Sequence, residues 1–356
     1  MKLWYYLNLS WAIDRFRLLS LIRQNLWARY PFLLKLHNRY CNQVIIKFID
    51  EYYINNEQEN RYYLAAIPHA TTGIGHAFSE WNTGRIIAQY CGLKFVHISL
   101  PDEWEKYLNL QKLGIPLSEV RSIPNLRVIT LPLFDYRECD PCLEIKQIVS
   151  NIRSSSPILF LLTDGQNLYD HNFYLSDLRG VYLKSHKPNL SFSLKQDNQQ
   201  TNCINVCVHI RRGDIVNMMT NNQSNWQERY VTLDYFDTLL KMMTEILADY
   251  QVAINIYSQG NNDEFQKFMK YDNVKLYINY DQFKTLNHMV FSDILIMSPS
   301  GFSYLAGLLS KGFKIARYPW WHEIPDQEDW YRLVGETQKN FDGLKSRLLN
   351  FIEYKI

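Results

Sequence analysis

Several features are scarce or missing in this sequence, and each absence excludes a class of protein. No stretch reaches the roughly 18 uninterrupted apolar residues that a membrane-spanning helix requires. Lysine and arginine total 38 and aspartate and glutamate total 36, so the formal net charge of +2 offers no general attraction for nucleic acid. Only six cysteines occur in 356 residues, and the chain begins with no recognisable secretory leader. These two features predict reduced thiols and a cytoplasmic location.

Motifs of common metal and cofactor sites are also missing. The sequence contains no strict Asp-x-Asp, no Walker loop and no H-E-x-x-H. The segment Cys139-Asp140-Pro141-Cys142 lacks the second pair or nearby histidine that would complete a tetrahedral zinc site. We therefore expect a turn at this segment, and neither a metal site nor a bound cofactor in the chain.

The length and composition predict two domains with flanking segments. A chain of 356 residues, 47% of them hydrophobic, is too large for one compact core. We expect an N-terminal amphipathic helical extension over residues 1–54, domains over 55–195 and 196–335, and a C-terminal helix over 336–356. Residues 1–40 mix aromatic and basic side chains, a pattern that fits either packing on the protein's own body or peripheral contact with a membrane.

Short apolar segments that alternate with helical patterns predict an α/β fold. In the first domain, strands at residues 63–67 and 94–98 flank a helix that begins near His76, and this βαβ order implies a parallel sheet. The second domain repeats the alternation after a polar segment at residues 184–202, the expected interdomain linker. Both domains are predicted to be Rossmann-like and to face each other across a cleft. Further strands are expected at residues 128–131, 158–162, 204–209, 252–257, 274–277 and 293–297, and further helices at 233–250, 263–269 and 304–310.

Three loops follow predicted strands, at the position where ligands collect in open α/β sheets. In the first loop, Gly73 and Gly75 precede a helix whose N-terminal N–H groups can bind an anion. The second loop, His209-Ile210-Arg211-Arg212-Gly213-Asp214, carries two arginines that can bind phosphate in a bidentate manner and a carboxylate that can orient one of them. The third loop, Ser298-Pro299-Ser300-Gly301-Phe302-Ser303, supplies serine hydroxyls and a second helix N-terminus. Together the loops predict a site for a diphosphate.

These loops resemble the signatures of a known group of enzymes. The HIRRGD segment after a strand, the segment Ile256-Tyr257-Ser258-Gln259-Gly260 and the stretch from Asp293 to Tyr304 are similar to the H-x-R-R-x-D and S-S-F-S signatures of the fucosyltransferase-like GT-B glycosyltransferases. This group covers α-1,2-, α-1,6- and protein O-fucosyltransferases. The loop from Gly73 to His76 is similar to the glycine-rich N-terminal motif of the same group.

The resemblance implies a metal-independent, inverting transfer of fucose from GDP-fucose to a hydroxyl of a glycan or another acceptor. It also implies a GT-B fold with an acceptor-side first domain and a donor-binding second domain. By matching positions, Arg211 and Arg212 would neutralise the charge that grows on the leaving GDP, and Asp214 would hold them. The other donor-binding residues would be Gly73, Gly75, His209, Ser258, Ser298, Ser300, Gly301, Phe302 and Ser303.

Three positions depart from the pattern of the group. His76 stands where asparagine is frequent, Gly301 replaces the second serine of S-S-F-S, and Gln259 stands where an acidic residue often follows the serine. In the group, that acidic side chain commonly reads the N–H edge of guanine. Asp263 and Asp293 are the expected substitutes for it.

The general base that accepts the proton of the acceptor hydroxyl is expected on the helix after the first loop. His76 and Glu80 lie one helical turn apart at the start of that helix, and either can take the proton. Glu228, after the arginine loop, is a further candidate. Glu80 has the alternative role of stabilising the positive end of the helix.

Other functions stay open at this point. A nucleotide-sugar-binding protein without turnover would keep the arginines and lose the base, and a GT-B transferase could use a different nucleotide sugar. A Rossmann oxidoreductase would need a complete G-x-G-x-x-G after its first strand, and only Gly73 and Gly75 are present.

Overall fold

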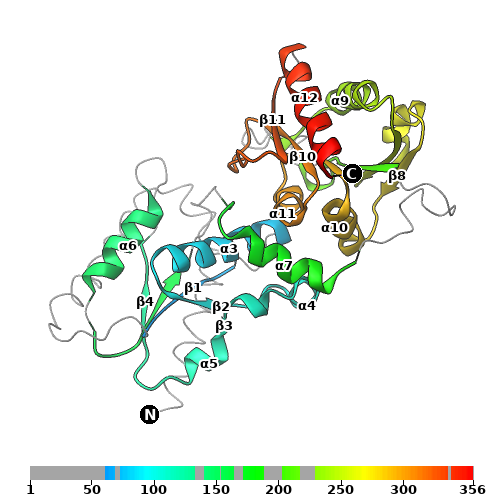
Figure 1. Ribbon diagram of the computed structural model, residues 1–356. Helices are drawn as coiled ribbons and strands as arrows, with labels where there is room; N and C mark the ends of the chain where they lie inside the picture. Colours follow the sequence, from blue (N-terminus) through cyan, green and yellow to red (C-terminus); the bar gives the residue numbers. More distant parts are fainter. Residues whose placement is uncertain are drawn as a thin grey trace. The chain divides into compact units, whose positions relative to one another are not determined.

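The structure is a computed structural model, and it describes residues 61–68, 73–132, 140–152, 154–163, 171–187, 203–216, 229–335 and 338–355. Its contacts divide the chain into two compact units, Met1–Val181 and Tyr182–Ile356. Each unit contains a parallel sheet with flanking helices (Figure 1), which confirms the predicted α/β class with two Rossmann-like units. The helical extension over residues 1–54, and with it the lipid contact of residues 1–40, lies outside the described residues. The cleft between the domains stays a prediction.

The first unit contains a five-stranded sheet in the order β3-β2-β1-β5-β4. Parallel pairing in register joins Tyr63 of β1 to Leu159 of β5. All five residues of β5 are buried because both faces of the sheet are covered, which explains why its sequence is a continuous apolar run. The strands are β1 (Tyr62–Ala66), β2 (Lys94–His97), β3 (Ile115–Pro116), β4 (Arg127–Thr130) and β5 (Ile158–Leu162).

Helices pack on both faces of this first sheet. Leu64 of β1 belongs to a buried cluster with Ile87 of α3 and Ile145 of α6, whereas its neighbour Ala65 packs with Val120 of α5 on the other face. The helices of the unit are α3 (Ile74–Tyr90), α4 (Asp102–Leu108), the 3-10 helix η1 (Leu110–Leu113), α5 (Leu117–Arg121), α6 (Pro141–Asn151) and α7 (Leu175–Ser185), the last of which crosses into the second unit.

Helix α6 begins inside the C-x-x-C segment, where the sequence predicted only a turn. The Asp140 carboxylate caps the helix by accepting hydrogen bonds from the backbone N–H groups of Cys142 and Leu143, and Pro141 occupies the first turn. A capping aspartate followed by proline is a helix start, so the prediction of a turn is corrected to a helix N-terminus. Cys139 lies outside the described residues.

Helix α3 lies very close to strand β1. At Gly84, an added Cβ atom would stand 2.5 Å from the Cβ and 3.0 Å from the backbone nitrogen of Ala66. Ala77 and Ala88 of the same helix are also fully buried. Glycine at position 84 therefore sets the distance between the helix and the sheet.

We expect the Gly84→Ala substitution to destabilise the protein by up to about 2 kcal/mol. The new methyl group overpacks the contact with β1 at a cost of about 1–3 kcal/mol, of which alanine recovers about 1 kcal/mol through its higher helix propensity. Gly180→Ala in α7 is the matched control, because nothing lies within 4 Å of its added Cβ. Thermal unfolding should show a lower Tm for Gly84→Ala and an unchanged or higher Tm for Gly180→Ala. Equal shifts for the two variants would contradict the close approach.

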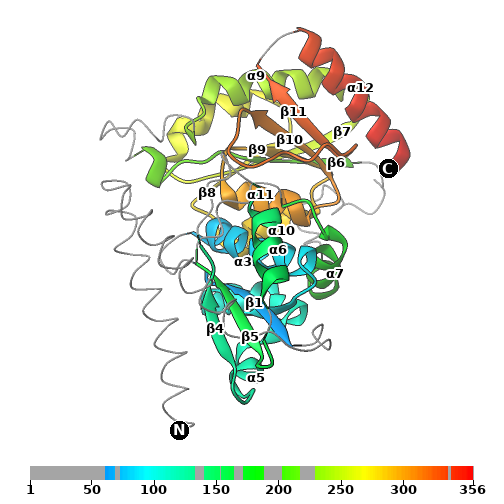
Figure 2. The same ribbon diagram turned by 90° about the vertical axis from the view of Figure 1, so that its left-hand side faces the viewer.

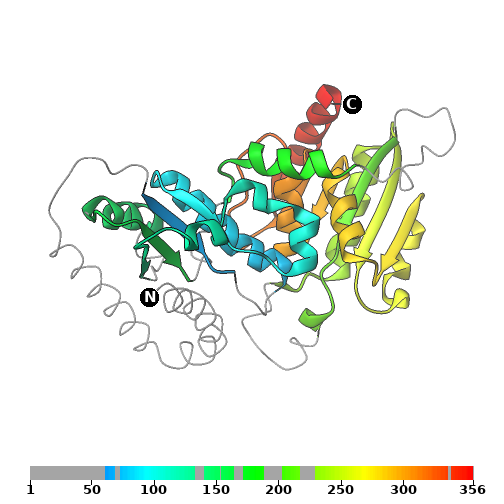
Figure 3. The same ribbon diagram turned by 90° about the horizontal axis from the view of Figure 1, so that it is seen from below.

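The second unit contains a six-stranded sheet in the order β11-β10-β9-β6-β7-β8. Numbered from the first strand of the unit, this is the 3-2-1-4-5-6 order of dinucleotide-binding Rossmann domains. Figure 3 shows β6 to β8 side by side, in green to yellow. The strands are β6 (Cys203–His209), β7 (Gln251–Ser258), β8 (Val274–Ile278), β9 (Ile294–Met297), β10 (Phe313–Tyr318) and β11 (Trp330–Val334).

Two layers of helices enclose the second sheet. Phe236 of α9, Phe265 of η6 and Leu348 of α12 share one buried cluster with the strands, while α10 and α11 contact each other on the opposite face (Figure 2). Helix α12 lies within the predicted C-terminal helix over 336–356, whereas η6 is a 3-10 helix. The helices are α9 (Leu233–Ile246), η6 (Asn262–Lys270), α10 (Gln282–Phe291), α11 (Gly301–Leu309) and α12 (Gln338–Lys355).

The boundary between the units falls inside α7, earlier than the position predicted at residues 195 and 196. The aromatic ring of Tyr182 is fully buried, stacks on His186 with 4.2 Å between ring centroids and lies 6.4 Å from the ring of Phe291 in α10. These contacts attach the last turn of α7 to the second unit. The polar segment at 184–202 therefore begins within a helix, and its larger part lies outside the described residues.

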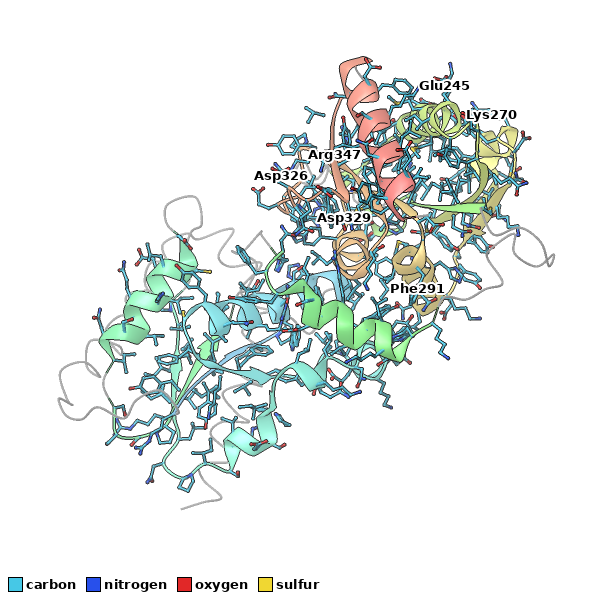
Figure 4. All side chains as sticks on the ribbon, viewed as in Figure 1. Glu245, Lys270, Phe291, Asp326, Asp329 and Arg347 are labelled. Atoms are coloured by element: carbon cyan, nitrogen blue, oxygen red, sulfur yellow. The ribbon has the colours of Figure 1, made fainter. Side chains whose placement is uncertain are left out.

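A buried ion pair joins the last two strands of the second sheet. The ammonium group of Lys314 on β10 has no exposed surface, and it donates hydrogen bonds to the Asp329 carboxylate and the Ser310 carbonyl. The Trp330 ring lies 5.2 Å from the Lys314 nitrogen. Figure 4 labels Asp329, which directly precedes β11. The charge of Lys314 is thus neutralised inside the core.

Two further features concern the described residues only. None of their helices combines the length and the apolar content needed to cross a membrane. Their cysteines Cys91, Cys142 and Cys207 are free thiols.

Candidate functional site

The order of strands in the second unit reverses between β6 and β9, which are neighbours in the sheet although β7 and β8 separate them in the chain. Open α/β sheets bind ligands beside the carboxyl ends of their strands at such a point. The register pairs Val208 with Ile296, so the two strands end almost level. The predicted arginine loop after β6 and the serine loop after β9 are therefore adjacent.

Ser298 ties the two loops together. Its hydroxyl donates to the carbonyl of His209 at 2.7 Å and accepts from the backbone N–H of Arg211 at 2.9 Å. Ser298 is buried, so both hydrogen bonds are shielded from water. The predicted donor-binding serine thus fixes the backbone from which Arg211 projects.

The guanidinium group of Arg211 lies between a helix N-terminus and a carboxylate. One terminal nitrogen donates to the Ser300 hydroxyl at 3.1 Å, and the other lies 2.8 Å from a carboxylate oxygen of Asp214. The third nitrogen, Nε, is buried and has no hydrogen-bond partner among the described residues. A buried N–H without an acceptor is costly, so an anion that accepts from Nε would improve the site.

Ser300 also caps helix α11. Its hydroxyl accepts a hydrogen bond from the backbone N–H of Phe302 at 3.3 Å. The first-turn N–H groups of a helix carry partial positive charge, and Gly301 adds no side chain there. The cation of Arg211 and the start of α11 therefore form one electropositive site.

Arg212 does not share the position of Arg211. Its side chain is 3% exposed, its terminal nitrogens donate to the carbonyls of Arg211 and Val231, and its guanidinium carbon lies 4.6 Å from the centroid of the Tyr230 ring. Burial lowers the pKa of Arg212, an effect that the nearby Tyr230 and Glu264 oppose. Arg212 thus contacts the arginine loop and Val231 from inside the protein, and its binding to a diphosphate stays a prediction.

His209 is held in a neutral form. Its Nδ1 atom lies 2.5 Å from the Ser303 hydroxyl, and its ring packs edge-on against Phe302. Burial, together with the charge of Arg211, lowers the pKa of His209 to about 3. The imidazole therefore stays uncharged at neutral pH and adds no second cation beside Arg211.

The low pKa of His209 predicts a pH dependence of folding stability. Below about pH 6.5 the histidine takes up a proton in the unfolded chain, whereas in the folded protein it stays neutral until the pH approaches 3. Stability contributed by this group is therefore present above pH 6.5 and lost as the pH falls toward 3. We expect His209→Gln to show a smaller fall in Tm between pH 7 and pH 4.5 than the wild-type protein. A fall of the same size in both proteins would argue against a neutral His209.

The loop after β7 completes the same edge of the sheet. The Ser258 hydroxyl donates to the carbonyl of Ile210 at 2.8 Å, and the Gln259 side chain lies directly over Gly213. Gly213 has a φ of +69°, at which a side chain is strained, and an added Cβ atom would lie 2.3 Å from the side-chain oxygen of Gln259. Ser258 thus supports the backbone of the arginine loop, and the side chain of Gln259 covers that loop at Gly213.

Asp293 does not belong to this site. It precedes β9 and therefore lies at the opposite, amino-terminal edge of the sheet, where its carboxylate accepts a hydrogen bond from the backbone N–H of Asn205. The prediction that Asp293 replaces the acidic residue of the group is corrected for this reason. Asp263, in the first turn of η6, follows the carboxyl end of β7 and is exposed.

The remaining predicted residues lie in the first unit. Gly73 caps α3, Gly75 lies in its first turn, and Nε2 of His76 lies 3.5 Å from a carboxylate oxygen of Glu80. The His76 side chain is 30% exposed and that of Glu80 is 3% exposed. His76 is therefore the more accessible of the two candidate bases. Glu228 lies outside the described residues.

Sequence reasoning missed the residues that support Arg212. Tyr230 covers its guanidinium and Val231 accepts its hydrogen bond, although Val231 follows Arg212 by 19 positions in the chain. Neither residue belongs to a motif. The one signal in the sequence is that the aromatic Tyr230 directly follows another arginine, Arg229, which is a pattern typical of a cation–π contact.

Comparisons with known proteins add weak similarities. The sequence matches no protein-family model and no curated protein. Among solved structures, POFUT1 in complex with GDP-fucose is similar at 10% sequence identity and a TM-score of 0.39, over 73% of this chain and 97% of that one. NodZ, an α-1,6-fucosyltransferase soaked with GDP-fucose, is similar at 12% identity and a TM-score of 0.34, over 71% and 94% of the two chains. The fucosyltransferase NodZ from Bradyrhizobium gives 10% identity and a TM-score of 0.35 over 71% and 94%.

Proposed function

We propose that the chain is a fucosyltransferase-like glycosyltransferase that binds the diphosphate of GDP-fucose at the loops after β6 and β9. The position of Arg211 carries the proposal. Its guanidinium is held beside the N-terminus of α11 by Ser300 and Asp214, and its buried Nε atom has no partner among the described residues. A phosphate oxygen is the acceptor that best fits such a cation.

In this reaction the bond between the anomeric carbon of fucose and the diphosphate oxygen breaks, and that oxygen keeps the electron pair. The acceptor hydroxyl forms the new bond from the opposite face, which inverts the anomeric configuration, and its proton passes to a base. Negative charge grows on the leaving diphosphate, where Arg211 and the start of α11 stabilise it. A fixed cation and a helix N-terminus thereby supply the charge for which many phosphoryl and glycosyl transfers recruit a metal ion.

The base is proposed to be His76, because it is the more exposed member of the pair with Glu80. Buried Glu80 would orient the imidazole through the 3.5 Å contact. Arg212, Ser258 and Ser298 would keep the arginine loop in position.

A thermal-shift screen of nucleotide sugars tests the donor assignment. At a concentration of about 100 Kd, a ligand that binds only the folded protein adds about 2.7 kcal/mol of stability. We expect GDP-fucose and GDP to raise the Tm, with EDTA present, and UDP-sugars to raise it less. No stabilisation by any guanine nucleotide would overturn the proposal, and equal stabilisation by UDP-sugars would overturn the choice of GDP-fucose.

A further inference from the structure

The segment after β10 lies at the same edge of the sheet as the proposed donor site. Strand β10 pairs with β9 in parallel, with Ala316 opposite Met297. The residues that follow, 319–322, therefore lie next to the serine loop that begins at Ser298. Neighbouring strands are about 4.8 Å apart, so this segment is two strand spacings from the arginine loop.

Aromatic side chains dominate this segment, and Trp321 is held at its centre. The guanidinium carbon of Arg229 lies 4.4 Å from the centroid of the Trp321 ring, and the rings of Trp320 and His322 lie 5.8 Å and 5.5 Å away. Trp321 nevertheless stays partly exposed. Its indole is thus fixed in orientation before any ligand arrives, which lowers the entropic cost of binding.

Two contacts connect this segment to the donor site. His322 stacks on Tyr304 of α11 with 4.1 Å between ring centroids and 2° between ring planes. Arg229, which covers Trp321, directly precedes Tyr230, the residue over which Arg212 stacks. The aromatic segment is therefore attached both to the helix capped by Ser300 and to the arginine loop.

Trp320 supplies a polar group that lacks a partner. Its side chain is 9% exposed, and its Nε1 atom is buried without a hydrogen-bond acceptor in the part of the chain that the structure describes. Buried indole N–H groups normally find an acceptor. A hydroxyl oxygen of a bound ligand would satisfy this group.

We propose that Trp320 and Trp321 bind a pyranose ring of a saccharide acceptor beside the donor site, an inference that rests on the proposed transferase function. The C–H face of a pyranose is apolar and packs on the negative face of an indole, while its hydroxyls can accept from an indole N–H or a guanidinium. Trp321 would supply the stacking face, Trp320 the hydrogen bond and Arg229 a second donor. The acceptor is then a glycan and not the hydroxyl of a polypeptide.

Tryptophan fluorescence, recorded with GDP present, tests this saccharide site directly. The probes are methyl β-glycosides of glucose, galactose, mannose and N-acetylglucosamine. We expect at least one probe to change the fluorescence of the wild-type protein, and the Trp321→Ala variant to bind it at least about tenfold more weakly. Trp321→Phe should recover part of the affinity, because phenylalanine keeps an aromatic face. Tyr354→Ala, which removes a 94% exposed ring at the end of α12, is the control and should bind as the wild type does.

GDP binding, measured by calorimetry on the same variants, separates this inference from the donor assignment. We expect Trp321→Ala to bind GDP with unchanged affinity, which also shows that the variant is folded. Loss of GDP affinity in Trp321→Ala would overturn the inference, because the indole would then stack on the nucleotide. Failure of every glycoside to bind the wild-type protein, or transfer to peptides only, would overturn it as well. Failure of the wild-type protein to bind GDP would instead overturn the proposed function.

Discussion

Replacing Arg211 by alanine is expected to slow sugar transfer by about 10³-fold or more, with little change in Tm. The substitution removes the cation beside the leaving diphosphate, where charge grows most in the transition state. Because the side chain of Arg211 is 21% exposed and contacts Ser300 and Asp214 at the loop surface, its loss leaves no cavity in the core. Transfer from GDP-fucose, followed by the release of GDP, measures the effect.

Two variants serve as controls for this result. Arg211→Lys keeps the charge but loses the forked donors, so we expect an intermediate rate. Arg212→Ala should lower the Tm, because it leaves the carbonyls of Arg211 and Val231 without their donor inside the protein. Wild-type turnover by Arg211→Ala would refute the donor site, and an unchanged Tm for Arg212→Ala would refute its structural role.

Replacing Asp329 by alanine is expected to destabilise the protein by about 3–5 kcal/mol. The change removes the carboxylate that neutralises Lys314, a lysine with no exposed surface, while the Ser310 carbonyl and the Trp330 ring remain as weaker partners. Thermal unfolding should show one of the largest losses of Tm available to a single substitution outside the proposed site.

The double variant Lys314→Met with Asp329→Leu distinguishes a lost charge pair from a lost packing contact. A buried ion pair can be replaced by apolar side chains at little cost, because neither charge then has to leave water. We expect the double variant to recover most of the Tm that Asp329→Ala loses. If it is as unstable as the single variant, the aspartate contributes through packing and not through its charge.

The regular parts of the fold could be predicted from the sequence because they depend on local patterns. Strands such as β5 and β6 are apolar runs, and α3 ends at Tyr90, shortly before Gly92, which has a φ of +69°. The short edge strand β3 gives no such pattern. The helix start at Asp140 was missed because its proline and aspartate are equally typical of turns.

The composition of the site could be predicted less completely. Arg211, Ser298 and Ser300 directly follow predicted strands in the sequence. Their position at one edge of the sheet could therefore be predicted, because parallel strands end at the same edge. The separate roles of Arg211 and Arg212 could not, because adjacent residues point in directions that only the tertiary structure sets. The place of Asp293 could have been inferred from the sequence, because a residue at the start of a strand lies at the amino-terminal edge of the sheet, opposite the loops that follow β6 and β9.

The hydrogen bond from Arg211 to Ser298 joins residues 87 positions apart in the chain. A loop of that length closes late and at a high entropic cost, so the anion-binding groups come together only when β9 has docked beside β6. A ligand at this site would then find no partly folded form to bind. Added GDP is therefore expected to slow unfolding of the second unit and to leave its refolding rate almost unchanged. The nucleotide would then stabilise the folded unit kinetically without assisting its folding.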